Sequence, residues 1–350
     1  MIVVSRRALA PLGGAAALAL AGCGASEVVE PGSTATAGEG GTRYPVVLDN
    51  GGHEVRVEAA PQRVVSLDQN STEILLSLGL ADRIVGTASW TDPVLEPLAE
   101  VNASVPRLAD NAPSYEVLMG ADPDFVTASF GRHFEEQGGV ATRERLAETG
   151  VGSYLSPTDL DDGTNVNGGS LSRTTPLTID ALHTEIRELA RIFDVTQRGE
   201  DLIADLTARA TAAVEGVDLG GRTVMFWFAA LDAPYVAGGR GAAALLTRTV
   251  GAESAFPDED QDWPALTWEA VVAADPDVLV LGDLHRNRFP GDQLAEKQGF
   301  LRTDPVAGTL TAARAERWIA LRGAEMNPSI RYVDGLEKVR AWWQDHGSDL

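Results

Sequence analysis

The chain has 350 residues, 44% of them apolar, and a formal net charge of −23 at pH 7. This length allows two domains, and the apolar fraction is typical of a globular protein with packed cores. The negative charge argues against a nucleic-acid partner, which requires a basic surface, and against adsorption to anionic lipid by charge alone.

The first residues have the pattern of a secretion signal. Arg6 and Arg7 precede an apolar run over residues 8–20 that is too short for a transmembrane helix. Cys23, the only cysteine, follows Leu-Ala-Gly directly after this run. The arrangement is similar to the lipobox of bacterial lipoproteins, in which the cysteine is acylated after cleavage. We therefore expect removal of residues 1–22 and lipidation of Cys23; a cleaved signal with an incidental thiol is the alternative.

Residues 23–43 are rich in Gly, Ser, Thr and Ala and lack apolar periodicity, which predicts a flexible tether. Folded structure is expected to begin near Tyr44. Residues 45–58 alternate around an Asn-Gly turn, which predicts a hairpin. After a strand at 63–67, Asn70 with a glutamate three residues later predicts a helix N-terminus. Short β-rich runs then alternate with helical stretches: strands at 83–88, 124–128 and 151–155, and helices at 114–121 and 139–149.

The polar stretch at 156–176 predicts a long loop, and two helices are expected after it, at 177–193 and 197–214. Beyond them the alternation begins again, with strands expected at 222–230, 277–283 and 318–323 and helices at 242–251, 267–274 and 334–346. Alternation of this kind is typical of α/β layers with largely parallel sheets. The sequence therefore predicts two α/β halves with helix between them.

One unit occurs twice, as YEVLMGADPDFVTASF at 115–130 and as WEAVVAADPDVLVLGD at 268–283. Ser114 and Thr267 directly precede the copies and are predicted helix caps. Each copy then has an aromatic, a glutamate, and Ala-Asp-Pro-Asp before a strand. Proline disfavours helix at the residue before it, so each helix should end there. Glu116 and Glu269 would stand in the first helical turn, where a carboxylate is favourable with the helix dipole. The dipole explains either glutamate but not the recurrence of the whole unit.

These two units, together with APQRVVSLDQNSTEILLSLGLADRIVGTA at 60–88 and YVAGGRGAAALLTRTVGAES at 235–254, resemble one family. It is the class III substrate-binding proteins of ABC importers for ferric siderophores, haem and cobalamin. The resemblance covers roughly residues 44–345. It implies two Rossmann-like lobes joined by a single long α-helix, with the ligand held in a cleft between the lobes. The expected parts are an N-terminal lobe at 44–195, a connecting helix at 196–216 and a C-terminal lobe at 217–350.

The resemblance also implies partners. In the family, the glutamate of each repeated unit pairs with arginines of the membrane permease, and here these residues are Glu116 and Glu269. Through the permease the protein would act with the ATPase, as a monomer anchored to the outer face of the cell membrane.

Ligands of open α/β sheets bind beyond the carboxyl ends of the strands. The loops after the two repeated strands both carry Arg and His beside an aromatic, which suggests an anionic ligand because arginine donates a planar fork of N–H groups. The alternative is that these arginines pair with the abundant acids of the chain. The candidate basic residues are Arg132, His133, His285, Arg286 and Arg288.

Aromatic side chains are further candidates for contact with the ligand. The resemblance implies that Trp90 and Trp263 line the cleft, and Tyr235 precedes a glycine-rich turn, whereas core packing is at least as good an account of Trp227. Arg240 lies in that turn, whose GRGAAA matches a dinucleotide fingerprint. An exported protein has no obvious supply of nicotinamide, so we expect no cofactor, although a helix start there can still offer N–H groups to an anion.

The chemistry of catalysis is not evident in the sequence. The five histidines are dispersed rather than clustered as a bare-metal site requires, and the motifs G-x-S-x-G, H-E-x-x-H and G-x-x-x-x-G-K-[ST] are absent. We therefore expect that the protein is not an enzyme, and that any metal arrives already bound in a chelate. The expected function is uptake of a ferric siderophore or similar iron complex. The alternative ligands are cobalamin, haem and a deazaflavin precursor. The alternative kinds of protein are a structural or sensory envelope protein and a lipid-anchored hydrolase.

Overall fold

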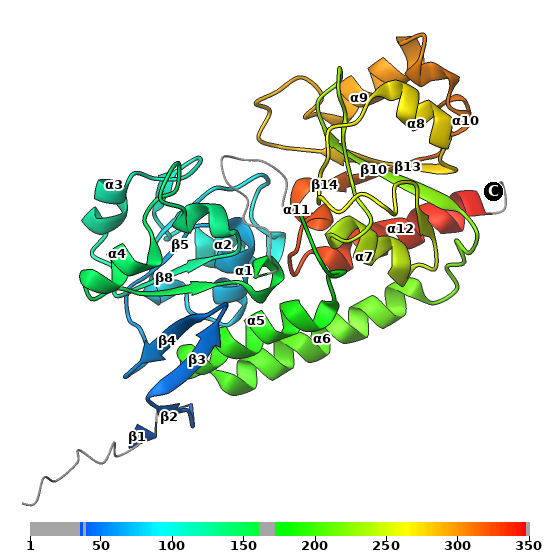
Figure 1. Cartoon of the computed structure of the whole chain (residues 1–350). Helices are drawn as coiled ribbons and strands as arrows, with labels where there is room; N and C mark the ends of the chain where they lie inside the picture. The colour runs from blue at the N-terminus through cyan, green and yellow to red at the C-terminus, as the bar shows by residue number, and fades with distance from the viewer. Residues whose placement is uncertain (1–35, 38–39, 161–171, 348–350) are drawn as a thin grey trace, which may run out of the picture. The chain divides into compact units, whose positions relative to one another are not determined.

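The computed structural model describes residues 36–37, 40–160 and 172–347. The expected signal at 1–22, the lipidation site Cys23, most of the tether and residues 161–171 of the expected loop lie outside these ranges. Among the described residues are two separate five-stranded sheets, each covered by helices (Figure 1). We call the parts built on these sheets the first and second lobes; together they belong to one compact unit.

The first sheet is parallel throughout, in the order β7-β6-β5-β8-β9. Successive residues of its central strands enter different cores. Val64 and Phe125 pack with helices α1 and α5, whereas their neighbours Val65 and Val126 pack with α3 and α4. Both faces are therefore buried, as parallel sheets require. The strands are β5 (Val64–Ser66), β6 (Ile84–Ala88), β7 (Arg107–Ala109), β8 (Phe125–Ala128) and β9 (Gly152–Leu155).

The second sheet follows the same plan, with β10 and β14 on either side of β13, all parallel. Val224 and Val280 face one core, and Met225 and Leu279 face the other. Two short strands extend its edge at β10, one antiparallel and one parallel. The strands are β10 (Thr223–Ala229), β11 (Tyr235–Val236), β12 (Glu253–Ser254), β13 (Val278–Asp283) and β14 (Trp318–Arg322).

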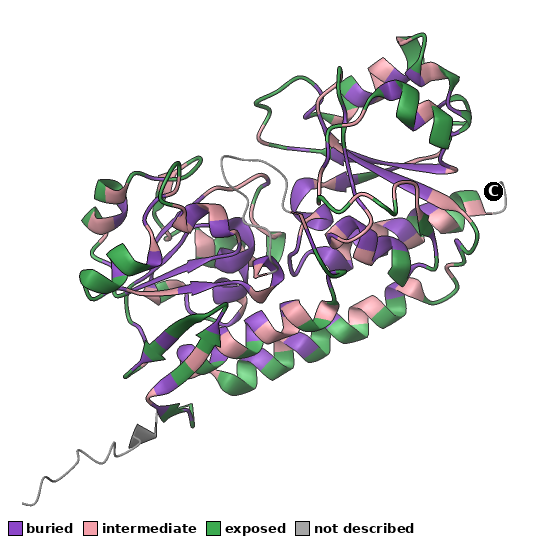
Figure 2. Ribbon diagram, in the orientation of Figure 1, coloured by how far each residue is buried: buried purple, intermediate pink, exposed green. Residues whose placement is uncertain are grey.

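Two antiparallel neighbours, α5 (Ile179–Ile192) and α6 (Thr196–Val214), lie between the sheets in sequence, and one side of each is exposed (Figure 2). α6 also packs against the last helix. The largest apolar cluster includes residues from both sheets, from α5 and from the last helix, so the lobes share one core. The other helices are α1 (Gln69–Ser77), α2 (Ala99–Asn102), α3 (Tyr115–Gly120), α4 (Arg143–Glu148), α7 (Ala242–Thr249), α8 (Trp268–Ala274), α9 (Leu294–Thr303), α10 (Thr311–Arg314), α11 (Gly323–Met326) and α12 (Tyr332–His346).

The expected α/β alternation is confirmed, including the hairpin, which is β3 (Val46–Asn50) with β4 (His53–Val57). A further small antiparallel pair joins β1 (Thr36–Ala37) to β2 (Arg43–Tyr44). The helix expected at 139–149 is shorter, because Thr142 caps it and its first turn begins at Arg143. Helices α2, α9, α10 and α11 were not predicted from the sequence.

The helix predicted to begin near Asn70 is present, but the predicted cap at Asn70 is wrong. α1 begins at Gln69 after Asp68, and no capping pair forms. The Asn70 side chain instead bonds Ser129 and Glu185 and accepts from the backbone N–H of Ile330 at 3.0 Å. Tertiary hydrogen bonds therefore use the polar groups that the sequence pattern assigned to a local cap.

The repeated unit has the same geometry in both lobes. Ser114 and Thr267 cap their helices by accepting from the N–H three residues later, as predicted. The first aspartate of each Ala-Asp-Pro-Asp has positive φ, 52° at Asp122 and 38° at Asp275. The second aspartate accepts backbone N–H groups at the start of the neighbouring central strand, at Gln62 and Arg63 in one lobe and at Thr223 in the other. The aspartates therefore fasten each helix to its sheet.

Candidate functional site

The strand order defines one switch point in each sheet. In the first sheet, β5 lies between β6, which follows it in the chain, and β8, so the chain changes direction across the sheet between β5 and β8. In the second sheet, β10 lies between β12 and β13, and the switch point is between β10 and β13. Ligands of open α/β sheets bind outside the carboxyl ends of strands at such points. In the first lobe these ends lead into Asp68 and Ser129, and in the second lobe into Ala230 and Leu284. Both basic loops singled out by the sequence begin here.

In the first lobe, the basic loop is organised by a buried carboxylate. Asp68 accepts the N–H groups of Ser129 and Phe130 at 2.7 and 3.2 Å, and it bonds His133 Nε2 at 2.9 Å. Arg132 lies 3.7 Å away. Burial opposes ionisation of Asp68, but these partners outweigh burial, so its pKa is lowered. His133 is only 1% exposed, which disfavours a ligand contact in this conformation, whereas Arg132 remains accessible.

In the second lobe, Asp292 has a comparable role, although it lies in the loop between β13 and α9. It is 0% exposed and binds Arg286 through two hydrogen bonds, at 3.0 and 3.2 Å. It also accepts the backbone N–H groups of Arg288 and Phe289. These donors outweigh burial and hold the pKa of Asp292 below its usual value. The carboxylate therefore fixes the loop from Leu284 to Asp292, on which His285 is exposed.

A row of rings accompanies this loop. The Arg286 guanidinium lies 5.4 Å from the centroid of Phe228, which in turn packs 4.8 Å from Trp263. Trp263 donates from Nε1 to Asn327 Oδ1 at 3.2 Å. The structure thus brings Arg286 and Trp263 together through Phe228. Trp227 is instead fully buried against Trp268, which supports the core assignment considered for it.

Trp90 lies beside Arg107 of β7, and an arginine of the second lobe, Arg288, contacts the end of the same strand. The guanidinium of Arg107 lies 4.7 Å from the centroid of the Trp90 ring, and Trp90 Nε1 donates to Thr87 at 2.9 Å. Arg288 reaches from the second lobe and donates from Nη2 to the carbonyl oxygen of Asp110 at 2.9 Å. Trp90 and Arg288 are therefore neighbours of the same short segment, β7 and its end.

Arg240 and Tyr235 are placed differently. Arg240 donates to the backbone carbonyls of Arg173 and Thr174, which ties the end of the expected loop to the second lobe. The glycine-rich turn is filled by protein: a Cβ at Gly238 would lie 2.1 Å from the carbonyl oxygen of Gln261. Tyr235 is 45% exposed on β11. The ligand contacts of both residues stay predictions.

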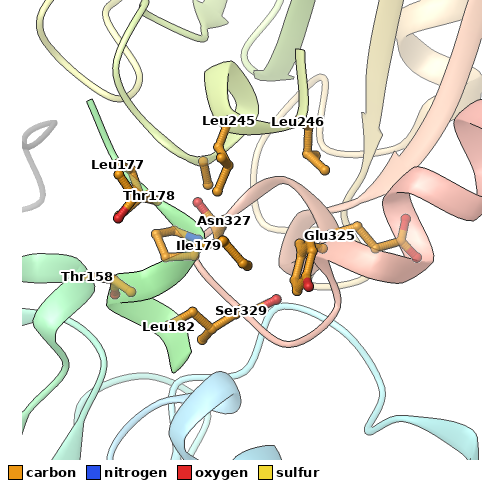
Figure 3. A pocket seen from close by; sticks show the side chains of 13 residues that line it. Thr158, Leu177, Thr178, Ile179, Leu182, Leu245, Leu246, Glu325, Asn327 and Ser329 are labelled. Carbon is orange, nitrogen blue, oxygen red and sulfur yellow. The ribbon is translucent and has the colours of Figure 1, made fainter. Parts of the chain in front are cut away.

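Two concave regions can be compared with this arrangement. A small cavity of about 10 Å³ lies among the start of α5, α7 and the segment 325–332 (Figure 3). It has room for about one water molecule and is too small for a metal chelate. An open depression of about 400 Å³ lies between β4, α4 and the start of β9. It is at the amino end of β9, away from the switch point, so neither region replaces the strand-end site.

Several residues of this site were not predicted. Arg107, Phe228, Phe289 and Asn327 supply charge, rings and an amide, and Asp292 holds the loop. Phe228 could have been found by its position at the end of a buried strand, and Asp68 by its place directly after one. The partners of Asp292 and Arg107 depend on loop conformation and on the other lobe, for which the sequence carries no local signal.

The two repeated glutamates are both exposed, at the second positions of α3 and α8. The pKa of Glu116 is lowered by its own backbone N–H and by the Ser114 hydroxyl. Within the described ranges, no group of three or more His, Cys, Asp or Glu residues is arranged to hold a metal ion. Among the same residues, no helix is both long and apolar enough to cross a membrane.

The two parallel-sheet lobes, the shared helices and the strand-end site define a two-lobed substrate-binding protein of the ABC-importer type. The chain belongs to the periplasmic binding protein family, whose model matches residues 64–324. Members of this family bind and deliver substrates outside the cytoplasm rather than convert them. The predicted fold class and the family resemblance are therefore confirmed.

Individual relatives are distant. The cobalamin-binding protein of Halobacterium salinarum is 24% identical over 287 residues, which is 81% of this chain and 70% of the relative. The vitamin B12-binding protein of Pectobacterium atrosepticum is 24% identical over 273 residues, 77% of this chain and 85% of the relative.

Solved structures share the fold. A periplasmic binding protein from Veillonella parvula superposes with a TM-score of 0.72 at 24% identity, covering 85% of this chain and 96% of its own. A structure described as an ABC-type Fe3+-hydroxamate transport system, from Saccharomonospora viridis, gives a TM-score of 0.69 at 25% identity. It covers 86% of this chain and 99% of its own.

Proposed function

We propose that this protein captures a ferric siderophore or similar iron chelate and delivers it to an ABC permease. The observation that carries the proposal is the set of aromatic and guanidinium groups near strand ends in both lobes, beside β6 and β7 in the first lobe and by the ends of β10 and β13 in the second. Trp90 and Arg107 stand in one lobe, and Phe228, Trp263 and Arg286 stand in the other. Flat rings provide apolar area for the organic part of a chelate, and guanidinium forks suit hydroxamate, carboxylate or catecholate oxygens.

The metal would come as part of the ligand. The two buried carboxylates of this site, Asp68 and Asp292, are engaged with basic side chains and backbone N–H groups. A chelate that already satisfies the coordination of its iron needs no protein ligand for the metal. The site would therefore recognise the outer oxygens and the organic framework.

Cobalamin is the second candidate, and the curated relatives favour it because both bear that name. Tryptophan fluorescence of the purified chain lacking the leader separates the two candidates. Titrants are a neutral ferric trihydroxamate, an anionic ferric tris-catecholate, haemin and cyanocobalamin. Saturable quenching by an iron chelate at micromolar concentration or below supports the proposal. Saturation by cyanocobalamin alone replaces iron with cobalamin, and no saturation by any of them overturns both.

The lipid anchor is part of the proposal. Acylation of Cys23 with two or more chains would hold the protein stably at the outer face of the membrane. The variant Cys23→Ser should leave a soluble or uncleaved product. A processed, acylated Cys23→Ser product in the membrane fraction would contradict the lipobox assignment.

A further inference from the structure

The arginines at the strand ends differ in what holds them. Arg132 and Arg286 lie beside Asp68 and Asp292, carboxylates that are 1% and 0% exposed. A buried carboxylate that loses its cationic partner is costly, so these two arginines serve their own loops first. Their positive charge is largely balanced inside the protein. They are therefore poor candidates for the principal anion contact of a ligand.

Arg107 and Arg288 have another environment. Arg107 Nε donates to the carbonyl oxygen of Ala109 at 3.1 Å, and Arg288 Nη2 donates to the next carbonyl, that of Asp110, at 2.9 Å. Two guanidinium groups from different lobes thus reach two consecutive carbonyls. In the described part of the chain, neither guanidinium has a carboxylate within ion-pair distance.

The two cations affect each other. Partial burial lowers the pKa of Arg107, the Asp110 carboxylate opposes this effect, and the positive charge of Arg288 adds to it. Like charges at one place are unfavourable unless an anion joins them. The carbonyl oxygens satisfy one N–H of each group, and a guanidinium has five N–H donors. Both groups therefore retain donors for a ligand.

Each arginine is also positioned by a rigid neighbour. The Trp90 ring lies under the Arg107 guanidinium and is itself fixed by its bond to Thr87. The backbone N–H of Arg288 donates to buried Asp292 at 2.8 Å. Positioned donors lose less freedom when they bind, which favours recognition of a group of fixed shape.

We propose that Arg107 and Arg288 form an oxyanion subsite that spans the two lobes. It would take a planar oxyanion, a carboxylate or the charged oxygens of a chelating group, with one guanidinium from each lobe. The subsite rests on the proposed function and deepens it, since it assigns the ligand an anionic edge. An anion held in this way would add a link between the second lobe's loop and β7 of the first lobe.

The test uses Arg107→Ala, Arg288→Ala and the double variant in the leaderless chain. The control is Arg302→Ala, which removes an exposed arginine of the second lobe that is paired with Glu316. Binding of citrate alone, of an anionic ferric tris-catecholate and of a neutral ferric trihydroxamate is measured by calorimetry at low ionic strength. Each single substitution should weaken the anionic probes about tenfold or more, since a charge-assisted hydrogen bond is lost. Arg302→Ala should bind like wild type.

Two further readouts make the result specific. Arg107→Lys and Arg288→Lys keep the charge but lose the fork, so they should restore only part of the affinity. The double variant should lose less than the product of the two single effects, because one bridging group contacts both arginines. Unchanged citrate binding in the double variant, or no citrate binding by wild type, overturns the subsite. If citrate binds through both arginines and no chelate binds, the subsite stands and the proposed function fails.

Discussion

Glu73 in α1 and Arg331 before α12 form a buried ion pair that joins the two lobes. Arg331 Nε donates to Glu73 Oε2 at 2.8 Å, Arg331 Nη2 donates to Oε1, and the side chains are 4% and 0% exposed. Two backbone contacts accompany the pair: Ile330 N–H to Asn70, and Ala324 N–H to Asp92. The segment from Ala324 to Arg331 is therefore fastened to the first lobe although it follows the last strand of the second.

The first prediction concerns this pair. Glu73→Ala or Arg331→Ala should each lower the free energy of unfolding by about 3–5 kcal/mol, because an unpartnered charge is left in the interior. Replacement of both by Leu and Met should lose much less, since two apolar side chains of similar volume need no partner. Urea unfolding of the four proteins measures this. If the Leu/Met double variant loses as much stability as the two single alanine variants together, the two side chains act independently and the prediction is wrong.

The second prediction concerns pH. Glu185 on α5 is 0% exposed, and burial raises its pKa from 4.5 to about 8, against the opposing bonds from Ser156 and Asn70. The folded state therefore holds a proton that the unfolded chain has lost. Its contribution to stability is complete below pH 4.5, falls as pH rises, and is lost once pH passes about 8.

Glu185→Gln should remove this part of the pH dependence. The slope of the free energy of unfolding between pH 5.5 and 8 should become less negative by up to about 1.4 kcal/mol per pH unit. The groups that face Glu185 also include Asp68 and Glu188, so the remaining slope need not be zero. The control is Glu148→Gln on the exposed end of α4. Identical slopes in wild type and Glu185→Gln would contradict a neutral Glu185.

The sequence was most informative where structure is set by neighbouring residues. Alternating apolar runs gave the central strands, and Ser114 and Thr267 were recognised as helix caps because capping needs only the next three residues. The repeated unit was also visible, since Asp-Pro ends a helix in both copies. The start of the helix expected at 139–149 was less accurate, because Gly139 and Thr142 both allow a start and the structure uses Thr142 as the cap.

Long-range partners could not be predicted. Asn70 and Glu73 have the spacing of a capping pair, yet their partners Ile330 and Arg331 are about 260 residues away in the chain. A polar side chain in the first turn of a helix can either cap that helix or bond a distant segment. The local sequence is the same in both cases, so it does not tell which bond forms. For the same reason the sequence selected Arg286 as a ligand residue, whereas the structure pairs it with buried Asp292.

The third prediction follows from that pairing. Arg286→Ala should lower the free energy of unfolding by about 1–3 kcal/mol, because Asp292 would lose its charged hydrogen bonds while remaining buried. Removing both side chains, in Arg286→Ala/Asp292→Ala, should recover part of the loss. The exposed pair Arg302–Glu316 supplies the comparison, and Arg302→Ala should have little effect. Equal unfolding midpoints for Arg286→Ala and Arg302→Ala would argue against a structural role of Arg286.

The fourth prediction addresses Glu116 and Glu269, which we expect to dock the protein on the permease. Both are exposed at helix starts, while the ligand loops follow the next strands. Substitution of both by Gln should reduce uptake and leave chelate affinity unchanged. Substitution of both by Arg should reduce uptake further, since like charges would then meet across the interface.

The matched control for docking is Glu144→Arg. Glu144 also stands at the second position of a short helix, α4, so it tests the effect of losing a helix-start carboxylate alone. Uptake should be normal in this variant. Wild-type uptake with both docking glutamates changed to Arg would refute the docking role, and loss of chelate binding with an intact fold would place these glutamates in the ligand site.

The central claim is that this protein delivers a chelated metal to its permease. The most direct measurement is uptake of radiolabelled iron, supplied as the chelate that the purified chain binds, in cells with the gene deleted and restored. We expect deletion to abolish high-affinity uptake of that chelate and the wild-type gene to restore it. Restoration should fail with the Arg107→Ala/Arg288→Ala gene at limiting chelate concentration. Undiminished uptake in the deletion strain, or full uptake with the double variant, would contradict the account.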